Sequence, residues 1–257
     1  MLAKNTILLL KAQGPNSHQD KYEALLKSKN FEVRQVKTLD FEFKNLDKLL
    51  EKVENYDDYS GIILSSPRCV QAVHMCAFSK SVKAWKSKFN FVVGEATYRD
   101  ALEKLGMDCR GRDTGNGLTL SKLILEYKPL CAKPFLIPHG NLKSDTINLE
   151  LEKGGIGVEC LEVYDSVVNN KIGHDLAEAT QNFQLIPEYV AFFSPSGFYS
   201  SIEHLRRLPI DLKEIKFIAI GPVTEMAILE SNLPVWGVAK RPNPDDLLDV
   251  ILNPIQY

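Results

Sequence analysis

The sequence predicts an α/β protein: two doubly wound parallel-sheet domains joined by a two-stranded linker and derived from an internal duplication. Two observations carry most of this prediction. Short, nearly continuous apolar stretches rich in β-branched and aromatic residues alternate with amphipathic helical stretches, a pattern typical of parallel strands buried on both faces. The same strand–loop–helix motifs also occur twice along the chain.

The repeated motifs lie where predicted strands end. Pro67 and Pro195 each follow a serine that closes an apolar stretch, and they lie 128 residues apart. Gly94 and Gly221 each end another such stretch, precede a threonine by three positions, and lie 127 residues apart. Weaker pairs have similar offsets: Leu8–Leu10 with Phe135–Ile137, and Phe31–Val33 with Ile156–Val158. Each copy is therefore predicted to contain about four strands with helices between them.

Helical periodicity and end signals define three of the connecting helices. Their apolar positions recur on one face, and each has a residue suited to a helix end. The three sets are Tyr98, Ala101, Leu102 and Leu105 before Gly106; Tyr22, Leu25 and Leu26 before Asn30; and Leu247, Val250 and Ile251 after the Asn243-Pro244 cap.

Composition excludes several functional classes. The chain has 257 residues, 44% hydrophobic and 25% charged, with a formal net charge of −2, so we expect a globular protein that binds neither nucleic acid nor membrane. No apolar stretch is long enough to span a bilayer, and the amino-terminal stretch lacks a signal-peptide pattern, so we expect a cytoplasmic protein. The five cysteines form no C-x-x-C pair, which favours reduced thiols. No metal or cofactor motif is present, and we expect none to be required.

The predicted strand ends carry three kinds of polar junction: the two Ser-Pro corners, the two glycine corners, and the segment His139–Lys143. Ligands of open parallel sheets bind at the carboxyl ends of the strands. The N–H groups and dipoles of helices that start there bind carboxylates or phosphates. Two domains facing each other are therefore predicted to hold an extended polyanion in a shared cleft.

Some of these residues also have purely structural interpretations. A Ser-Pro corner is a good helix cap without any ligand. Arg68, in the first turn of a predicted helix, is either part of a structural salt bridge or a contact for a ligand carboxylate. Tyr164, which follows an apolar run, is either a packing residue at a hinge or a phenol that acts as a weak acid.

These motifs together resemble those of the uroporphyrinogen-III synthase family. They occur in the family's order over nearly the whole chain: Ser66-Pro67-Arg68, Val93-Gly94-Glu95-Ala96-Thr97, Gly140-Asn141-Leu142-Lys143, Val163-Tyr164, Phe192-Phe193-Ser194-Pro195-Ser196-Gly197 and Ile220-Gly221-Pro222-Val223-Thr224.

The resemblance implies a discontinuous domain layout. One domain would combine residues 1–37 with 169–257, the other would span 41–163, and residues 38–40 and 164–168 would link them. The family's two connections suggest a hinge that closes on substrate. The repeat alone would instead favour a division near the middle of the chain.

The resemblance also implies an activity. The substrate would be hydroxymethylbilane, which loses water, cyclises through a spiro intermediate and leaves as uroporphyrinogen III with its last pyrrole ring inverted. Tyr164 would assist departure of the hydroxyl group. The substrate-binding residues would be Ser66, Arg68, Gly94, Thr97, Gly140, Asn141, Lys143, Ser194, Ser196, Gly197, Gly221 and Thr224. The family expectation is a monomer that needs no metal or cofactor.

Two other functions use similar architecture. A two-domain binding or sensor protein would close on an anionic small molecule without doing chemistry. A nucleotide-sugar transferase would also have two α/β domains, but it would require a metal, and the sequence contains no D-x-D motif to hold one. Separation of the isomers formed from hydroxymethylbilane distinguishes the synthase from a binding protein, which would leave only the uninverted product, whereas protection by UDP against thermal unfolding would indicate the transferase.

Overall fold

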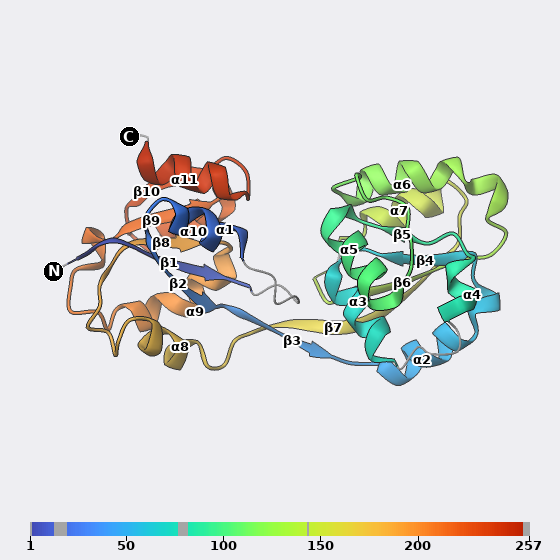
Figure 1. The fold of residues 1–257 in the computed structure, drawn as a ribbon, viewed down its shortest axis with the longest axis horizontal. Helices are drawn as coiled ribbons and strands as arrows, with labels where there is room; N and C mark the ends of the chain where they lie inside the picture. Colours follow the sequence, from blue (N-terminus) through green and yellow to red (C-terminus); the bar gives the residue numbers. More distant parts are fainter. Residues whose placement is uncertain (1, 13–19, 77–81, 143, 254–257) are drawn as a thin grey trace. The chain divides into compact units, whose positions relative to one another are not determined.

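A computed structural model describes residues 2–12, 20–76, 82–142 and 144–253 (Figure 1). The chain forms two compact units: unit 1 comprises the residues up to Asp40 and from Val167 onward, and unit 2 comprises Phe41–Ser166. The predicted domains, 1–37 with 169–257 and 41–163, have boundaries close to these. The assignment of 38–40 and 164–168 as a linker stays a prediction.

Unit 1 contains a five-stranded sheet in the order β10-β9-β8-β1-β2, with parallel pairing between all neighbours. Its strands are β1 (Ala3–Lys11), β2 (Glu32–Lys37), β8 (Pro187–Phe192), β9 (Lys216–Ile220) and β10 (Val235–Ala239). Its helices are α1 (Lys21–Ser28), α8 (Ile172–Ala179), α9 (Pro195–Leu205), α10 (Pro222–Glu230) and α11 (Pro244–Leu252), with a short 3₁₀ turn at Leu212–Glu214.

Both faces of this sheet are buried by helices. Leu8 and Leu10 of β1 join a core with α8, α9 and α10, whereas Ile7 and Leu9 join a core with α1 and α11. Successive side chains of one strand therefore enter different cores, as expected for a doubly wound sheet.

Unit 2 repeats this layout with the sheet order β3-β7-β6-β4-β5. Its strands are β3 (Leu39–Phe43), β4 (Gly61–Leu64), β5 (Phe91–Val92), β6 (Phe135–Gly140) and β7 (Val158–Val168). Its helices are α2 (Leu46–Glu54), α3 (Pro67–Met75), α4 (Val82–Lys86), α5 (Gly94–Leu105), α6 (Gly117–Glu126) and α7 (Thr146–Lys153), with 3₁₀ turns at Tyr56–Asp58 and Lys128–Leu130. Helices α2 to α5 cover one face and α6 and α7 the other.

The predicted fold class is confirmed, and the strand orders match the predicted repeat. The order β9-β8-β1-β2 in unit 1 corresponds to β5-β4-β6-β7 in unit 2 when each strand is paired with its sequence counterpart. The expectation of about four strands in each copy is one too low, because β10 and β3 extend the two sheets. Origin by duplication stays a prediction.

The predicted helix ends are largely confirmed. Gly106 and Asn30 follow their helices with φ of 61° and 62°, the left-handed conformation that ends helices. The Asn243 side chain caps α11 by accepting a hydrogen bond from the Asp246 N–H at 2.8 Å. Leu102, predicted to face the core, is 45% exposed, because the buried face of α5 consists of Thr97, Asp100, Ala101 and Leu105. No helix among the described residues combines the length and hydropathy that a membrane span requires.

Candidate functional site

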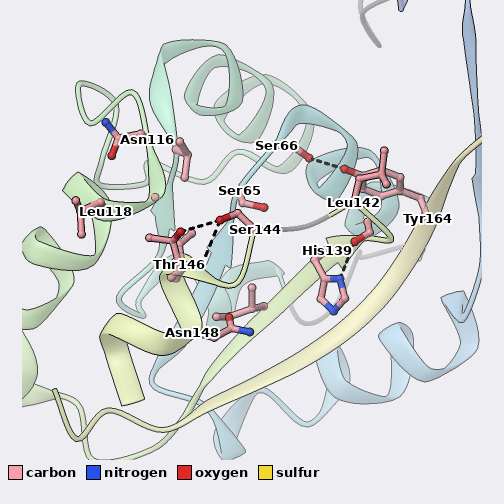
Figure 2. A pocket seen from close by; sticks show the side chains of 15 residues that line it. Ser65, Ser66, Asn116, Leu118, His139, Leu142, Ser144, Thr146, Asn148 and Tyr164 are labelled. Carbon is pink, nitrogen blue, oxygen red and sulfur yellow. Dashed lines mark hydrogen bonds between the residues drawn. The ribbon is translucent and has the colours of Figure 1, made fainter. Parts of the chain in front are cut away.

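A cavity of about 500 Å³ opens in unit 2 where strands β4 and β6 end and helices α3, α6 and α7 begin (Figure 2). This is the edge at which open parallel sheets bind ligands, and the volume suits a small organic molecule. Its lining residues are Ser65, Ser66, Val93, Asn116, Gly117, Leu118, Ile137, His139, Gly140, Leu142, Ser144, Thr146, Ile147, Asn148 and Tyr164.

Ser66 connects the start of α3 to the cavity. Its hydroxyl oxygen accepts a hydrogen bond from the Cys69 N–H at 3.4 Å, and Pro67 occupies the first turn, so the predicted cap is confirmed. The same oxygen lies 3.3 Å from the phenol oxygen of Tyr164 (Figure 2). The residue that caps α3 therefore also contacts the phenol of Tyr164 in the cavity wall.

Two more helices begin at the cavity wall. Asn116 caps α6 by accepting from the Thr119 N–H at 2.9 Å. Before α7, the Ser144 hydroxyl lies 2.7 Å from that of Thr146 and accepts from the Thr146 N–H at 3.3 Å (Figure 2). Three helix starts around one cavity create a positive potential that favours carboxylates.

The lining carries almost no formal charge. The described lining contains no aspartate, glutamate, lysine or arginine. The His139 ring holds its Nδ1 atom 2.9 Å from the carbonyl oxygen of Gly140. Hydroxyls, amides and helix dipoles therefore provide the polar character of this cavity, and the leucine and isoleucine side chains provide apolar walls.

Tyr164 lies at one side of the cavity, on β7 (Figure 2). Its ring packs edge-on against Phe41, with centroids 6.0 Å apart, and against Phe43, at 6.3 Å. Burial, and to a smaller extent the neighbouring Cys69 thiol, raises the pKa of the Tyr164 phenol. The phenol therefore stays protonated at neutral pH and can donate a hydrogen bond or a proton.

The structure brings only part of the predicted unit 2 set into the cavity. Ser66, Gly140 and Tyr164 line it, whereas Arg68, Gly94, Thr97 and Asn141 do not belong to its lining. Lys143 lies outside the described residues.

The unit 2 residues outside the lining have other neighbours. Arg68 donates to the Gln71 side chain at 2.8 Å and stacks 4.0 Å from the Phe41 ring centre, and burial lowers the pKa of its guanidinium. Gly94 has φ of 78°, and Thr97 is 2% exposed. The Asn141 side chain accepts from the Ser166 N–H at 2.9 Å.

The predicted residues of unit 1 form two corners. The Ser194 hydroxyl accepts from the Gly197 N–H at 3.1 Å and lies 3.1 Å from the Ser196 hydroxyl. Gly221 has φ of 88°. The buried Thr224 hydroxyl donates to the carbonyl of Ile220 at 3.4 Å.

A second hollow, of about 560 Å³, lies on unit 1 beside β2 and α8. It is mostly charged, and its described lining is Lys11, Arg34, Gln35, Val36, Lys37, Asp175, Glu178 and Ala179. None of the predicted site residues belongs to this lining.

Sequence reasoning missed the walls contributed by α6 and α7. Asn116, Gly117 and Leu118, which are not among the predicted site residues, line the cavity at the start of α6. Ser144 and Thr146 carried no motif at all. In the sequence, only a capping residue before each of α6 and α7 could have indicated these walls. Such a residue predicts a helix start but does not predict that the two helix starts lie side by side.

Comparison with known proteins supports a particular family. The fold is that of a two-unit, doubly wound α/β protein. A model of the family described as uroporphyrinogen-III synthase HemD matches residues 20–249. Uroporphyrinogen-III synthase of Saccharomyces cerevisiae is 26% identical over 255 residues, covering 90% of each chain.

Solved structures agree with this result at the level of the fold. The crystal structure of uroporphyrinogen-III synthetase from Helicobacter pylori 26695 has a TM-score of 0.61 at 14% identity, covering 96% of this chain and 98% of that one. A mutant uroporphyrinogen III synthase from the extremely thermophilic bacterium Thermus thermophilus has a TM-score of 0.50 at 14% identity, covering 96% and 97%.

The chain belongs to the uroporphyrinogen-III synthase family, because the family model matches most of its length. The predicted family is confirmed, and with it the predicted class of activity, a cyclising lyase of porphyrin and haem biosynthesis.

Proposed function

We propose that the unit 2 cavity holds part of hydroxymethylbilane and that Tyr164 assists its cyclisation to uroporphyrinogen III. The substrate carries acetate and propionate groups on every pyrrole ring. The starts of α3, α6 and α7 around the cavity suit such carboxylates, because their N–H groups and dipoles favour negative charge. The apolar side chains of the wall, such as Leu118 and Leu142, suit the pyrrole rings.

The Tyr164 phenol is proposed to donate a proton as the terminal hydroxyl leaves. The carbon–oxygen bond breaks, the hydroxyl departs as water, and the adjoining pyrrole nitrogen gives up its proton to leave a neutral azafulvene. The proton released by the pyrrole nitrogen replaces the one that the phenol donated, so the overall change is the loss of water. Burial raises the pKa of Tyr164, so the phenol carries its proton at neutral pH, which is the protonation state that a donor requires, although the same shift makes it a weaker acid.

Ring inversion then depends on geometry. The substituted carbon of the last pyrrole ring attacks the azafulvene to form a spiro intermediate, which fragments and recloses with that ring inverted. The bilane also closes in solution without inversion, so the protein must hold the chain in a curled conformation that favours the spiro route.

The remaining predicted contacts are part of this proposal. In unit 2, Arg68, Gly94, Thr97, Asn141 and Lys143 would contribute to carboxylate binding together with Ser66 and Gly140. In unit 1, the same role is proposed for Ser194, Ser196, Gly197, Gly221 and Thr224. At Gly94 and Gly221, where φ is positive, the contact would come from the backbone.

The observation that carries the proposal is the 3.3 Å contact between Tyr164 and Ser66 at the wall of a cavity that is surrounded by helix starts and lined by no acidic, lysine or arginine side chain. The test is incubation with hydroxymethylbilane and chromatographic separation of the oxidised product isomers. The expected product is the inverted isomer. Formation of the uninverted isomer alone would indicate a binding or sensor protein and contradict the proposal.

We further propose that the protein acts as a monomer in the cytoplasm. The five cysteines are free thiols, which fits a reducing compartment. Sedimentation velocity at micromolar concentration, with and without a reductant, tests the monomer. A stable dimer would contradict it.

A further inference from the structure

Gly140 lies directly against the ring of Tyr164. A Cβ atom added at Gly140 would lie 2.4 Å from Cε2 and Cζ of the ring and 2.8 Å from the phenol oxygen. Real Cβ atoms do not approach ring carbons this closely, so any other residue at position 140 must displace the ring. The ring occupies the space where a side chain would otherwise be.

The need for glycine here is not conformational. Gly140 is not among the glycines with positive φ, so its backbone conformation is accessible to alanine. The residue is also buried at the end of β6, where glycine weakens a strand. The close approach of Tyr164 is therefore the structural reason for glycine at this position.

A change of strand register brings the two residues together. His139 pairs with Glu162, but the next residue, Gly140, pairs with Tyr164, so the pairing skips Val163. Such a bulge redirects a side chain. The Asn141 N–H then donates to the Tyr164 carbonyl at 3.1 Å, which holds the pairing beyond the bulge.

Three other residues contact the Tyr164 side chain. The edges of Phe41 and Phe43 contact it, and Ser66 lies 3.3 Å from its hydroxyl. The residues that position the ring are therefore Gly140, Phe41, Phe43 and Ser66, all in unit 2. Of these, Gly140 is the residue for which the smallest chemical change, one methyl group, would displace the ring.

We propose that Gly140 is a positioning residue: it leaves the space that lets the Tyr164 phenol reach Ser66 and the cavity. Its effect on turnover rests on the proposed function, whereas its effect on the position of the ring does not. Gly140 therefore acts on the reaction through Tyr164. An effect of this kind disappears when the phenol is removed, whereas the effect of a direct contact between Gly140 and the substrate would remain.

The kinetic test is a double-mutant cycle on formation of uroporphyrinogen III. Gly140→Ala should lower kcat by about the factor that Tyr164→Phe does, on the order of 100-fold for loss of a positioned acid. In the Tyr164→Phe background, Gly140→Ala should lower kcat no further. An equal loss in both backgrounds would show that Gly140 acts independently of the phenol and would overturn the proposal.

A spectroscopic test does not depend on activity. The protein is labelled with ¹³Cζ-tyrosine, and the Tyr164 signal among nine tyrosines is identified by its loss in Tyr164→Phe. Gly140→Ala should move this signal and lower the pH at which it titrates, because the displaced phenol becomes more exposed. An unmoved signal would overturn the proposal even if the enzyme makes no inverted product.

A matched control and a rescue complete the design. Gly157→Ala, where an added Cβ meets Pro134 at an ordinary 3.4 Å, should change kcat by less than about twofold, as for most surface substitutions. If Gly140→Ala does not fold, Gly140→Ala/Tyr164→Ala should fold, because the ring that the methyl group meets is absent. Failure of this double variant to fold would overturn the proposal.

Discussion

The Ser-Pro corners of the two units have the same local structure. Ser66 has φ and ψ of −155° and 159°, and Ser194 has −159° and 156°. Each hydroxyl accepts a hydrogen bond from the N–H three residues further on, and each proline occupies the first turn of the helix. The two corners are equivalent as helix starts.

Their surroundings differ. The Ser66 hydroxyl contacts Tyr164 and lines the unit 2 cavity, which contains no acidic, lysine or arginine side chain, whereas the Ser194 hydroxyl contacts Ser196. The hollow described on unit 1 is mainly charged, and Ser194 is not part of its lining. The Ser-Pro motif therefore specifies where a helix begins but not which chemistry takes place beside it.

A strand register produces part of this difference. In unit 1, β2 pairs with β1 in continuous register from Glu32 to Lys37. In unit 2, the corresponding pairing of β7 with β6 shifts by one residue after His139 and places Tyr164 opposite Gly140. The bulge and the tyrosine itself, which β2 lacks, together bring a phenol to one of the two corners.

The largest effect is expected for Tyr164→Phe. The variant keeps the ring that packs against Phe41 and Phe43 but removes the proton donor, so kcat should fall about 100-fold with little change in stability. Initial rates of uroporphyrinogen III formation and a thermal melt measure the two quantities. Unchanged turnover would remove Tyr164 from the mechanism and, with it, the main difference between the two corners.

Gly221→Ala should give the next largest effect, on stability. Gly221 has φ of 88° and ψ of 164°, a region occupied almost only by glycine, and alanine there should cost about 2 kcal/mol. Urea unfolding of the variant measures this cost. Gly94→Ala, at φ of 78°, is the matched change in unit 2. A cost near zero at only one of the two positions would show that the glycine corners are not equivalent, and a cost near zero at Gly221 would contradict the prediction.

Removal of each cap tests the comparison directly. Ser66→Ala and Ser194→Ala should each lower the free energy of unfolding by about 1 kcal/mol. Ser66→Ala should also lower kcat about fivefold, the value of one neutral hydrogen bond, whereas Ser194→Ala should raise KM and leave kcat unchanged. Parallel urea titrations and steady-state kinetics provide both measurements. Equal kinetic effects in the two variants would mean that the contact with Tyr164 has no catalytic consequence.

Local features of the fold could be predicted from sequence, whereas the walls of the site could not. The caps at Ser66 and Asn243 and the stop at Gly106 depend on neighbouring residues, so the sequence contains their complete signal. The cavity wall at Asn116 requires the start of α6 to lie beside that of α7, and this packing of two separate segments has no signal in either segment alone. The β7 bulge likewise has no residue signature, because it is defined by pairing with β6.

The smallest effect is expected for Thr224→Ala, which should raise KM for hydroxymethylbilane about threefold. The effect is small because the buried Thr224 hydroxyl already donates to Ile220, so a carboxylate gains at most a fraction of one hydrogen bond, below about 1 kcal/mol. Steady-state kinetics measure the change, and Thr224→Ser, which keeps the hydroxyl, is the control. Thr97→Ala provides the corresponding test in unit 2. If KM stays at its original value in both alanine variants, the two threonines have only a packing role, and the glycine corners must contact the substrate through their backbone amides or not at all.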